Sequence, residues 1–179
     1  VLADDPMLNC RLEDDPVDPV RIICDSSLMI PEDSQLVRTA GEIPTIVAYV
    51  PERAEKRMKE SGDGDKARRL AACGVELLPV AADGGHVDLR ELMKLLGERK
   101  IDSVLLEGGG ELNFSALKAG IVSRIQAYLA PKIVGGSGAK TPVSGEGIGK
   151  MADSIRLSAP QVSFFGQDLL LEYDVTEAE

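Results

Sequence analysis

The sequence predicts an α/β fold in which strands and helices alternate along one domain, 1–179. Short β-branched runs bounded by Pro, Asp and Ser alternate with segments of helical periodicity, an order typical of parallel βαβ units. The last two apolar runs are instead joined by Gly166 and Gln167, which favours an antiparallel hairpin. We therefore expect a mixed, mostly parallel sheet with helices on both faces and a C-terminal hairpin.

The first half of the chain carries clear punctuation for its elements. Pro51 suits a first helical turn and Gly62 suits the position just after a helix, so one helix is bounded on both sides. The elements expected here are, in order, strand 20–25, strand 45–50, helix 51–62, helix 65–74 and strand 75–80.

The second half begins with a strongly amphipathic segment. Four apolar residues spaced i, i+3, i+4 and i+7 form one stripe, which we assign to the core: Leu89, Leu92, Met93 and Leu96. The elements expected from there on are helix 87–100, strand 103–108, helix 111–120, strand 124–135, and the closing strands 155–165 and 168–175.

Composition excludes several classes of function. A net charge of −10 argues against a nucleic-acid partner, because phosphate contacts need a basic surface. No apolar run is long enough to span a membrane, and no signal peptide is visible. Three cysteines without metal-ligand spacing and a single histidine, His86 in a turn-like segment, predict reduced thiols, a cytoplasmic location and no metal site.

Three consecutive glycines, 108–110, follow the predicted strand 103–108 and precede a predicted helix. In open α/β sheets, ligands bind beyond the carboxyl ends of the strands, and the free N–H groups at a helix start attract phosphate oxygens. Close packing of strand on helix without a ligand is the alternative, because a glycine run after a strand is a weak motif by itself.

Four motifs in order give the chain a family resemblance: VLADDPMLNCR (1–11), RIICDSSLMIP (21–31), SVLLEGGGELNFSALKAGIV (103–122) and YLAPKIVGGSGAKTPVSGEG (128–147). Together they resemble the reductase domain of riboflavin biosynthesis, over almost the whole chain. The resemblance implies a dihydrofolate-reductase-like three-layer fold and a 5-amino-6-(5-phosphoribosylamino)uracil reductase. It also implies NADPH as the cofactor, which would pass a hydride to C1′ of the ribose and leave a ribityl chain.

Two alternatives remain open at this point. The same residues would serve a reductase that acts on the undeaminated diaminopyrimidine ribosyl phosphate. The second alternative is not an enzyme: the chain could be a nucleotide-binding or structural module that has the same fold without catalysis.

The resemblance also implies site residues, although it assigns no catalytic residue. Substrate-binding positions are Leu8, Arg11 and Glu107. Cofactor-binding positions are Asp4, Ser26, Gly109, Gly110, Glu111, Leu112, Asn113, Phe114 and Ser115.

Each of these positions has a plainer interpretation from the residues alone. Arg11 could form a surface ion pair with Glu13 or Asp14, and Ser26 could be a turn or cap serine. Three basic residues could read the 2′-phosphate of NADPH, although a solvated helix face is the favoured interpretation for them: Arg53, Lys56 and Arg57.

Reductase domains of this kind usually begin with a strand, an Asp-Gly loop and a helix, and we expect that portion to be lacking here. A zinc-dependent deaminase commonly stands upstream and would be part of the full protein. The last run carries Phe164, Phe165 and three leucines, so one face of the closing hairpin is expected to be covered by another subunit in a homo-oligomer.

Overall fold

The computed structural model describes residues 4–136 and 138–176. The chain divides into two units, Val1–Leu95 and Leu96–Glu179. Each unit is described by itself below.

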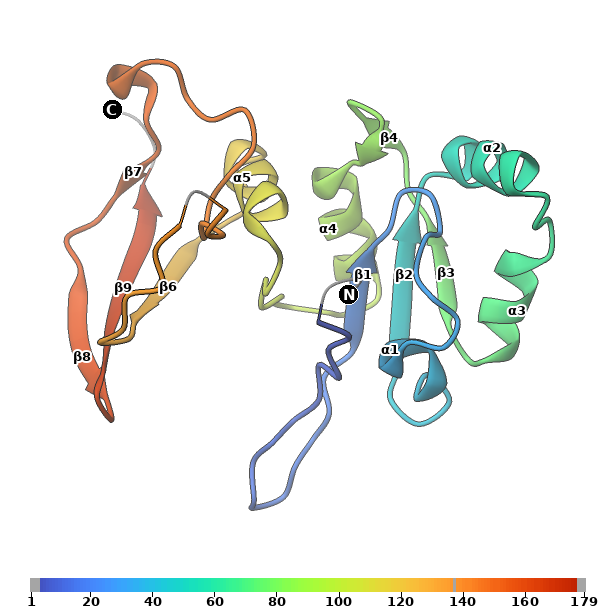
Figure 1. Cartoon of the computed structure of the whole chain (residues 1–179), viewed down its shortest axis with the longest axis horizontal. Coiled ribbons are helices and arrows are strands. Elements are labelled where there is room, and N and C mark those ends of the chain that lie inside the picture. The colour runs from blue at the N-terminus through green and yellow to red at the C-terminus, as the bar shows by residue number, and fades with distance from the viewer. Residues whose placement is uncertain (1–3, 137, 177–179) are drawn as a thin grey trace. The chain divides into compact units, whose positions relative to one another are not determined.

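A parallel sheet of three strands lies at the centre of the first unit (Figure 1). It consists of β1 (Arg21–Cys24), β2 (Thr45–Tyr49) and β3 (Glu76–Pro79), in that spatial order. Ile23 is opposite Val47, and Val47 is opposite Leu77, so the three strand ends point the same way. The loops that follow the strands therefore leave from one edge of the sheet.

Helices connect these strands. The first crossover contains the short α1 (Gln35–Arg38), and the second contains α2 (Pro51–Ser61) and α3 (Lys66–Ala72). Pro51 occupies the first turn of α2, as its sequence signal predicted. Gly62 ends α2 in the left-handed conformation with φ of 69°, a backbone state that glycine adopts without steric cost.

A small hairpin and a helix follow β3. Strands β4 (Ala82–Asp83) and β5 (His86–Val87) pair in antiparallel fashion, and α4 (Leu89–Glu98) comes directly after them. Asp88 caps α4, because its Oδ1 accepts hydrogen bonds from the backbone N–H groups of Arg90 and Glu91.

The core of the first unit is a contiguous apolar cluster. Its buried members come from the sheet, the helices and the connections between them: Ile23, Leu28, Ile30, Leu36, Val37, Ala40, Val47, Ala54, Leu70 and Val75. Leu8 packs against this cluster from the N-terminal segment although it is only partly buried.

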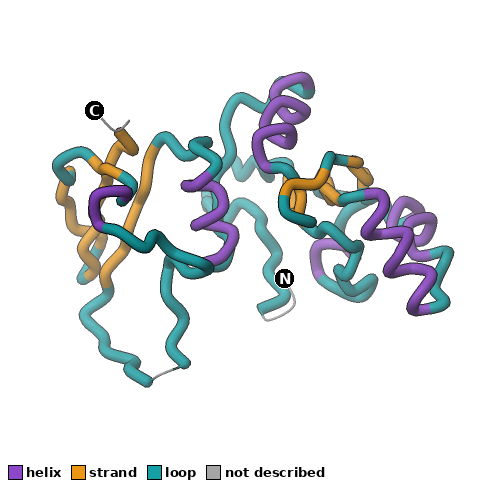
Figure 2. The backbone as a smooth tube through the Cα atoms, turned by 90° about the horizontal axis from the view of Figure 1, so that it is seen from above, coloured by secondary structure: helices purple, strands orange, loops and turns teal. Residues whose placement is uncertain are grey.

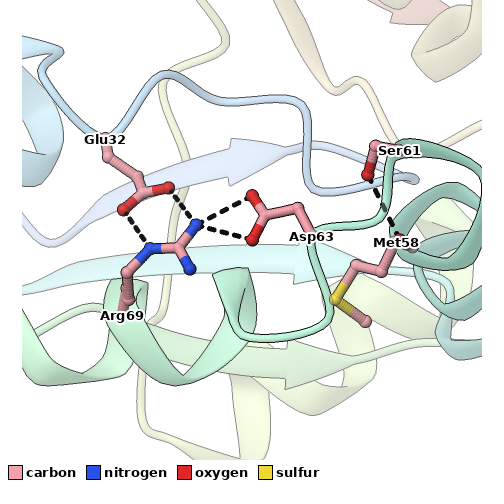
Figure 3. Close-up of polar contacts among 5 residues, drawn as sticks. All are labelled: Glu32, Met58, Ser61, Asp63 and Arg69. Atoms are coloured by element: carbon pink, nitrogen blue, oxygen red, sulfur yellow. Dashed lines mark hydrogen bonds and ion pairs between the residues drawn. The ribbon is translucent and has the colours of Figure 1, made fainter.

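A salt-bridge network ties α3 to two loops (Figure 3). Arg69 donates to both carboxylate oxygens of Glu32 at 2.8 Å, and its Nη2 donates to Asp63 at 2.8 Å. The hydrogen bond from Arg69 holds the pKa of Glu32 below its ordinary value of 4.5. Ser61, which donates to the carbonyl of Met58 at 3.3 Å, closes the last turn of α2 nearby.

The second unit is built on an antiparallel sheet. Helix α5 (Gly110–Lys118) leads into β6 (Arg124–Leu129), and a long loop leads to the 3₁₀ helix η1 (Met151–Asp153) and the two-residue β7 (Arg156–Leu157). The closing hairpin consists of β8 (Gln161–Phe165) and β9 (Asp168–Thr176), and β9 pairs with β6, β7 and β8.

Most predicted elements are confirmed, and the α/β class with its closing antiparallel hairpin is confirmed with them. The predicted run 155–165 is two strands, because Pro160 lies between them and has no N–H to donate to a ladder. Sequence reasoning missed α1 and the β4–β5 hairpin, both of which are too short to show a period.

The predicted strand 103–108 is wrong. None of the described strands pairs with this run, and Val104, Leu105 and Leu106 are 42%, 76% and 39% exposed. An apolar run predicts burial, but a strand also needs a neighbour to accept its hydrogen bonds, and the sequence of the run contains no information about that neighbour. The expectation of one mixed sheet is corrected too, because the parallel and antiparallel strands form separate sheets.

We expect replacement of Arg69 with Met to weaken the pH dependence of stability. The lowered pKa of Glu32 means that its ion pair stabilises the fold above about pH 4.5 and loses this contribution as the pH falls through the folded-state pKa. The difference in melting temperature between pH 7 and pH 3 should therefore be smaller in Arg69→Met than in the unmodified protein. Arg68→Met is the control, since Arg68 is 86% exposed and reaches Asp65 only at 4.0 Å. Equal pH dependence in all three proteins would contradict the role of the network.

Candidate active site

The loop after β1 is shaped by Asp25. Its backbone N–H donates to the carbonyl of Ala48 at 2.9 Å, and its Oδ2 accepts from the N–H of Ile30 at 2.7 Å. Between Asp25 and Ile30, the almost fully buried Leu28 adopts a left-handed backbone conformation with φ of 53°. The loop is therefore held tightly while Ser26 and Ser27 lie at its turn.

Ser26 joins the ends of several strands. Its Oγ accepts from the N–H of Val87 in β5 at 3.1 Å, and its carbonyl accepts from the N–H of Val50 at 3.2 Å. A serine hydroxyl that already accepts one bond still has its own hydrogen to donate. The turn-serine interpretation is thus correct for the backbone of Ser26, and its O–H remains able to bind a ligand.

Of the three basic residues considered for the 2′-phosphate, Arg53 is directed at these strand ends. Its Nε donates to Ser27 Oγ at 3.3 Å, and a Cβ placed on Gly85 would lie 2.8 Å from its Nη1. Lys56 instead lies 3.9 Å from Glu60 within its own helix, with 77% of its side chain exposed. The start of α2 and the end of β3 form a shallow hollow of about 460 Å³ lined by Pro51, Glu52, Pro79, Val80, Ala81 and Ala82.

The N-terminal arm, residues 4–11, contains no helix or strand, and the described trace next to the N label is loop (Figure 2). Asp5 accepts from the N–H of Gln35 at 2.9 Å, and its carbonyl accepts from the Gln35 side chain. Leu8 adopts φ of 47° and turns its side chain onto the core. Asp4 and Arg11 are exposed, and within the described residues Arg11 forms no ion pair with Glu13 or Asp14, so its guanidinium is open to solvent.

The glycine run proves to be a close-packing device at two of its three positions. A Cβ on Gly110 would lie 2.6 Å from Ser144 Oγ and 2.8 Å from the carbonyl of Thr141, while a Cβ on Gly108 would meet Leu112 at 2.8 Å. All three glycines lie outside the left-handed region. Gly109 is the N-cap of α5 in extended conformation, and a Cβ placed on it would have open space to at least 4 Å.

The segment 141–144 covers the start of α5. Ser144 donates its N–H to the carbonyl of Gly110 at 3.1 Å, and the Asn113 side chain donates to the carbonyl of Pro142 at 2.8 Å. This contact was missed by sequence reasoning, which used 128–147 only as a family motif. Its signal was the pairing of a three-glycine run with a second glycine-rich segment.

The other residues of the glycine segment have distinct environments. Phe114 is directed inward, where it lines an apolar hollow of about 490 Å³ with Leu117 and Ile125. Ser115 Oγ donates to the carbonyl of Glu111 at 2.9 Å, within its own helix. The predicted site residues therefore fall into separate sets: Asp4, Leu8, Arg11 and Ser26 in the first unit, and Glu107 with 109–115 in the second.

The start of α5 fits part of a dinucleotide. Asn113 Oδ1 is buried and lacks a hydrogen-bond partner among the described residues, and the N–H groups of a first helical turn have no intrahelical acceptor. These groups offer an acceptor for an amide or hydroxyl and donors for phosphate oxygens. Glu107, by contrast, is exposed in the unpaired segment before the glycines.

Two features are absent from the part of the chain that the structure describes. No group of three or more His, Cys, Asp or Glu side chains is arranged to hold a metal ion there. None of the described helices combines the length and the apolar character that a membrane crossing requires.

The order of elements and the loops at the strand ends define a dihydrofolate-reductase-like α/β domain. The model of one family, the RibD C-terminal domain, matches residues 1–171. The chain belongs to this family.

Two relatives illustrate the range of the family. The chain is 47% identical over 175 residues to the riboflavin biosynthesis protein RibD of Actinobacillus pleuropneumoniae, covering 98% of this chain and 44% of that protein. It is 37% identical over 177 residues to the 2,5-diamino-6-ribosylamino-4(3H)-pyrimidinone 5′-phosphate reductase of Methanothermobacter thermautotrophicus, covering 98% of this chain and 76% of that protein. The chain thus spans less than half the length of the first relative.

Solved structures agree with the fold. Acinetobacter baumannii RibD matches with a TM-score of 0.74 and 25% identity, over 98% of this chain and 44% of that one. The riboflavin biosynthesis reductase Rib7 of Saccharomyces cerevisiae matches with a TM-score of 0.70 and 22% identity, over 98% of this chain and 72% of that one.

We expect Gly110→Ala to destabilise the second unit and Gly109→Ala to change it little. The added methyl at position 110 overlaps Ser144 Oγ and the Thr141 carbonyl, and such overpacking costs about 1–3 kcal/mol. The methyl at position 109 has open space around it, so we expect a loss of no more than about 1 kcal/mol there. Urea unfolding of both variants, followed by circular dichroism, measures the difference, and equal stability of the two would refute the close contact.

Proposed function

We propose that this chain is a nicotinamide-dependent reductase that converts the ribosyl group of 5-amino-6-(5-phosphoribosylamino)uracil into a ribityl group in riboflavin biosynthesis. The match to the RibD C-terminal domain over residues 1–171 carries this proposal. It is supported by two relatives that each cover 98% of this chain and whose names contain riboflavin biosynthesis or a pyrimidinone phosphate reductase. A cytoplasmic location is part of the same proposal.

The bound nicotinamide would supply the hydride that reduces C1′ of the ring-opened ribose. The chain itself would supply position and charge, because a hydride transfer depends above all on the approach of the two reacting carbons. No side chain is assigned as a catalytic residue.

The substrate would be held by residues of the N-terminal arm and by Glu107. Arg11 would bind the ribose 5-phosphate, since a guanidinium can donate to two phosphate oxygens at once and this one is open to solvent. Leu8 fixes the arm on the core through its side chain. The exposed carboxylate of Glu107 would accept hydrogen bonds from the pyrimidine N–H groups or the ribose hydroxyls.

The cofactor would be held by Asp4, by the free O–H of Ser26, and by the start of α5 from Gly109 to Ser115. We further propose NADPH rather than NADH, because Arg53 lies at the strand ends with its guanidinium on Ser27. A guanidinium there can pair with the additional phosphate of NADPH, whereas the adenosine ribose of NADH offers it only a neutral hydroxyl.

A second substrate is favoured by one observation. The Methanothermobacter thermautotrophicus relative is named for the diaminopyrimidinone and spans this chain for 98% of its length. Because the residues proposed to hold phosphate and ribose serve either base, turnover of the two pyrimidines must be compared directly. A non-catalytic module would reduce neither of them.

We expect substitutions of Arg11 and Arg53 to separate the two ligands. Arg11→Ala removes a charge-assisted contact worth about 1.5–3 kcal/mol, so the KM for the ribosyl pyrimidine should rise about tenfold or more while NADPH affinity stays unchanged. Arg53→Ala should lower the affinity for NADPH by a similar factor and leave the affinity for NADH and the substrate KM unaffected. Steady-state kinetics and calorimetry on the full-length protein measure both effects, with Lys56→Ala as the matched control in α2.

The outcomes discriminate between the parts of the proposal. If neither pyrimidine is reduced with either nicotinamide, the reductase proposal fails. If NADPH and NADH bind equally well, only the role of Arg53 fails.

We also propose an upstream deaminase partner in the full-length protein. A Thermotoga maritima structure with a TM-score of 0.70 is named as a deaminase and reductase, and this chain covers 43% of it. At 22% identity, that similarity shows the fold alone. The proposal of a deaminase domain therefore depends on the RibD relatives, of whose length the chain spans less than half.

The closing hairpin supports a homo-oligomer. Residues opposite one another on paired strands share a face, which places Val162 with Leu171 and Phe164 with Leu169 and Leu129. On this apolar sheet face Val162, Phe164 and Leu129 are 58%, 77% and 49% exposed. The other face carries polar cross-strand pairs such as Arg124 with Asp174 together with the exposed Tyr128 and Phe165, so an isolated chain would leave apolar side chains of this sheet in water.

We expect light scattering at micromolar concentration to give the mass of a dimer or larger assembly. Phe164→Glu should shift this mass to that of the monomer, because a charge inside a buried interface is strongly unfavourable. Gln161→Glu is the control on the opposite face of the same strand. A monomer in the unmodified protein would contradict the proposed interface.

A further inference from the structure

Arg21, the first residue of β1, is a buried arginine whose donors are all in use. Its side chain is among the largest of the fully buried ones, with a relative exposure of 2%. Nε donates to Thr45 Oγ1 at 3.0 Å, and Nη2 donates to Thr45 Oγ1 at 2.6 Å. The remaining bonds go to the carbonyls of Leu36 and Ile43 from Nη2 and to Thr39 Oγ1 and the Met7 carbonyl from Nη1.

The acceptors around this guanidinium are neutral. Three are backbone carbonyls and two are threonine hydroxyls, and among the described residues no carboxylate is hydrogen-bonded to Arg21. Burial lowers the pKa of Arg21, and Asp18 opposes this effect from a distance. An arginine stays charged nevertheless, so the fold carries the desolvation cost of a cation that lacks a direct counter-ion.

That cost is explained by what the guanidinium connects. Its acceptors come from four segments: the N-terminal arm, α1, the turn 39–43 and β2. Arg21 is a donor to the buried Leu36 carbonyl, and a buried carbonyl left without a donor costs about 1–3 kcal/mol. The Ile43 carbonyl also accepts from Thr45 Oγ1 at 2.8 Å. A guanidinium is the side chain whose five N–H groups, in fixed planar geometry, can satisfy all of these acceptors together.

The bond to the Met7 carbonyl gives Arg21 a consequence for the site. Met7 lies between Asp5, which is bonded to Gln35, and Leu8, whose side chain packs on the core. Arg21 holds the carbonyl between these two attachments at 3.1 Å. Leu8 and Arg11, both proposed to bind substrate, come after Met7 on the same arm.

We propose that Arg21 is a positioning residue that fixes the N-terminal arm and thereby the affinity of the site for its phosphorylated substrate. It touches neither substrate nor cofactor. The link to substrate affinity rests on the proposed function, whereas the anchoring of the arm does not.

The test compares Arg21→Lys with Arg69→Lys in the full-length protein. Lysine keeps the charge at position 21 but has three donors, so the bonds to all four segments cannot form together. Arg69 is the matched control, because it too is a multiply bonded arginine of the first unit but its partners are Glu32 and Asp63. Asp5→Ala is a further variant, which releases the arm at the exposed bond to Gln35 without a change in the core.

Two measurements are made on each variant. Amide hydrogen exchange followed by mass spectrometry reports the protection of the peptide that contains residues 4–11. Kinetics report the KM for the ribosyl pyrimidine and the affinity for NADPH. We expect Arg21→Lys and Asp5→Ala to speed exchange of the arm and to raise the substrate KM about tenfold, which corresponds to about 1.4 kcal/mol. NADPH affinity should fall in the same variants, because Asp4 on the same arm is proposed to bind the cofactor.

The control separates positioning from general stability. Arg69→Lys should lower the melting temperature while arm exchange and substrate KM stay as in the unmodified protein. If Arg21→Lys loses stability but keeps both normal arm exchange and normal KM, Arg21 is only structural and the proposal is overturned. If the unmodified protein reduces neither pyrimidine, the proposed function fails, and hydrogen exchange still decides whether Arg21 anchors the arm.

Discussion

The first unit depends on one set of hydrogen bonds, those that converge on Arg21. Parallel strands leave the carbonyl groups of their connections at the ends of the sheet, where β1, β2, α1 and the arm meet. Water cannot satisfy these groups once the core has closed over them. A single guanidinium on β1 does so, and it joins a segment without regular secondary structure to the most ordered part of the fold. The position of the arm is thus a property of the sheet.

Strand β1 also leads into a loop whose hydrogen bonds lie outside the buried cluster around Arg21. Beyond its last residue, Asp25 shapes the loop that presents Ser26 and Ser27, and Val87 and Arg53 secure that loop from the hairpin and from α2. The bond from Val87 to Ser26 is part-buried and the bond from Arg53 to Ser27 is exposed, and a bond of either kind contributes about 1 kcal/mol. A ligand can replace such bonds at small cost, whereas the buried bonds of Arg21 resist exchange. Both the arm and this loop are thus held by the fold, which is the preorganisation that the proposed site would need.

How far the sequence determines these features depends on the range of the interactions. The long elements with caps, such as α2 between Pro51 and Gly62, could be predicted because their signals are local. Arg21 could not be recognised, because nothing in the sequence of a strand indicates that four distant segments will direct carbonyls and a hydroxyl at one side chain. The strand expected at 103–108 failed for the same reason, since its partner lies outside the run itself. Family motifs supplied the candidate site residues, which local patterns alone would have left as turns and surface charges.

The glycine run shows how packing and binding can depend on the same residues. Gly110 lets the segment 141–144 approach the start of α5, and that segment then takes the Asn113 amide N–H, which leaves Asn113 Oδ1 buried and without a donor among the described residues. A close-packed loop therefore creates an unsatisfied acceptor next to the free N–H groups of a helix start. An unpaired buried acceptor is unfavourable in the absence of a ligand, and a donor from a bound dinucleotide would remove that cost. Close packing and ligand binding, which the sequence left as alternatives, are thus compatible: the glycines allow the loop to pack closely, and the helix start beside it keeps the groups proposed to bind the cofactor.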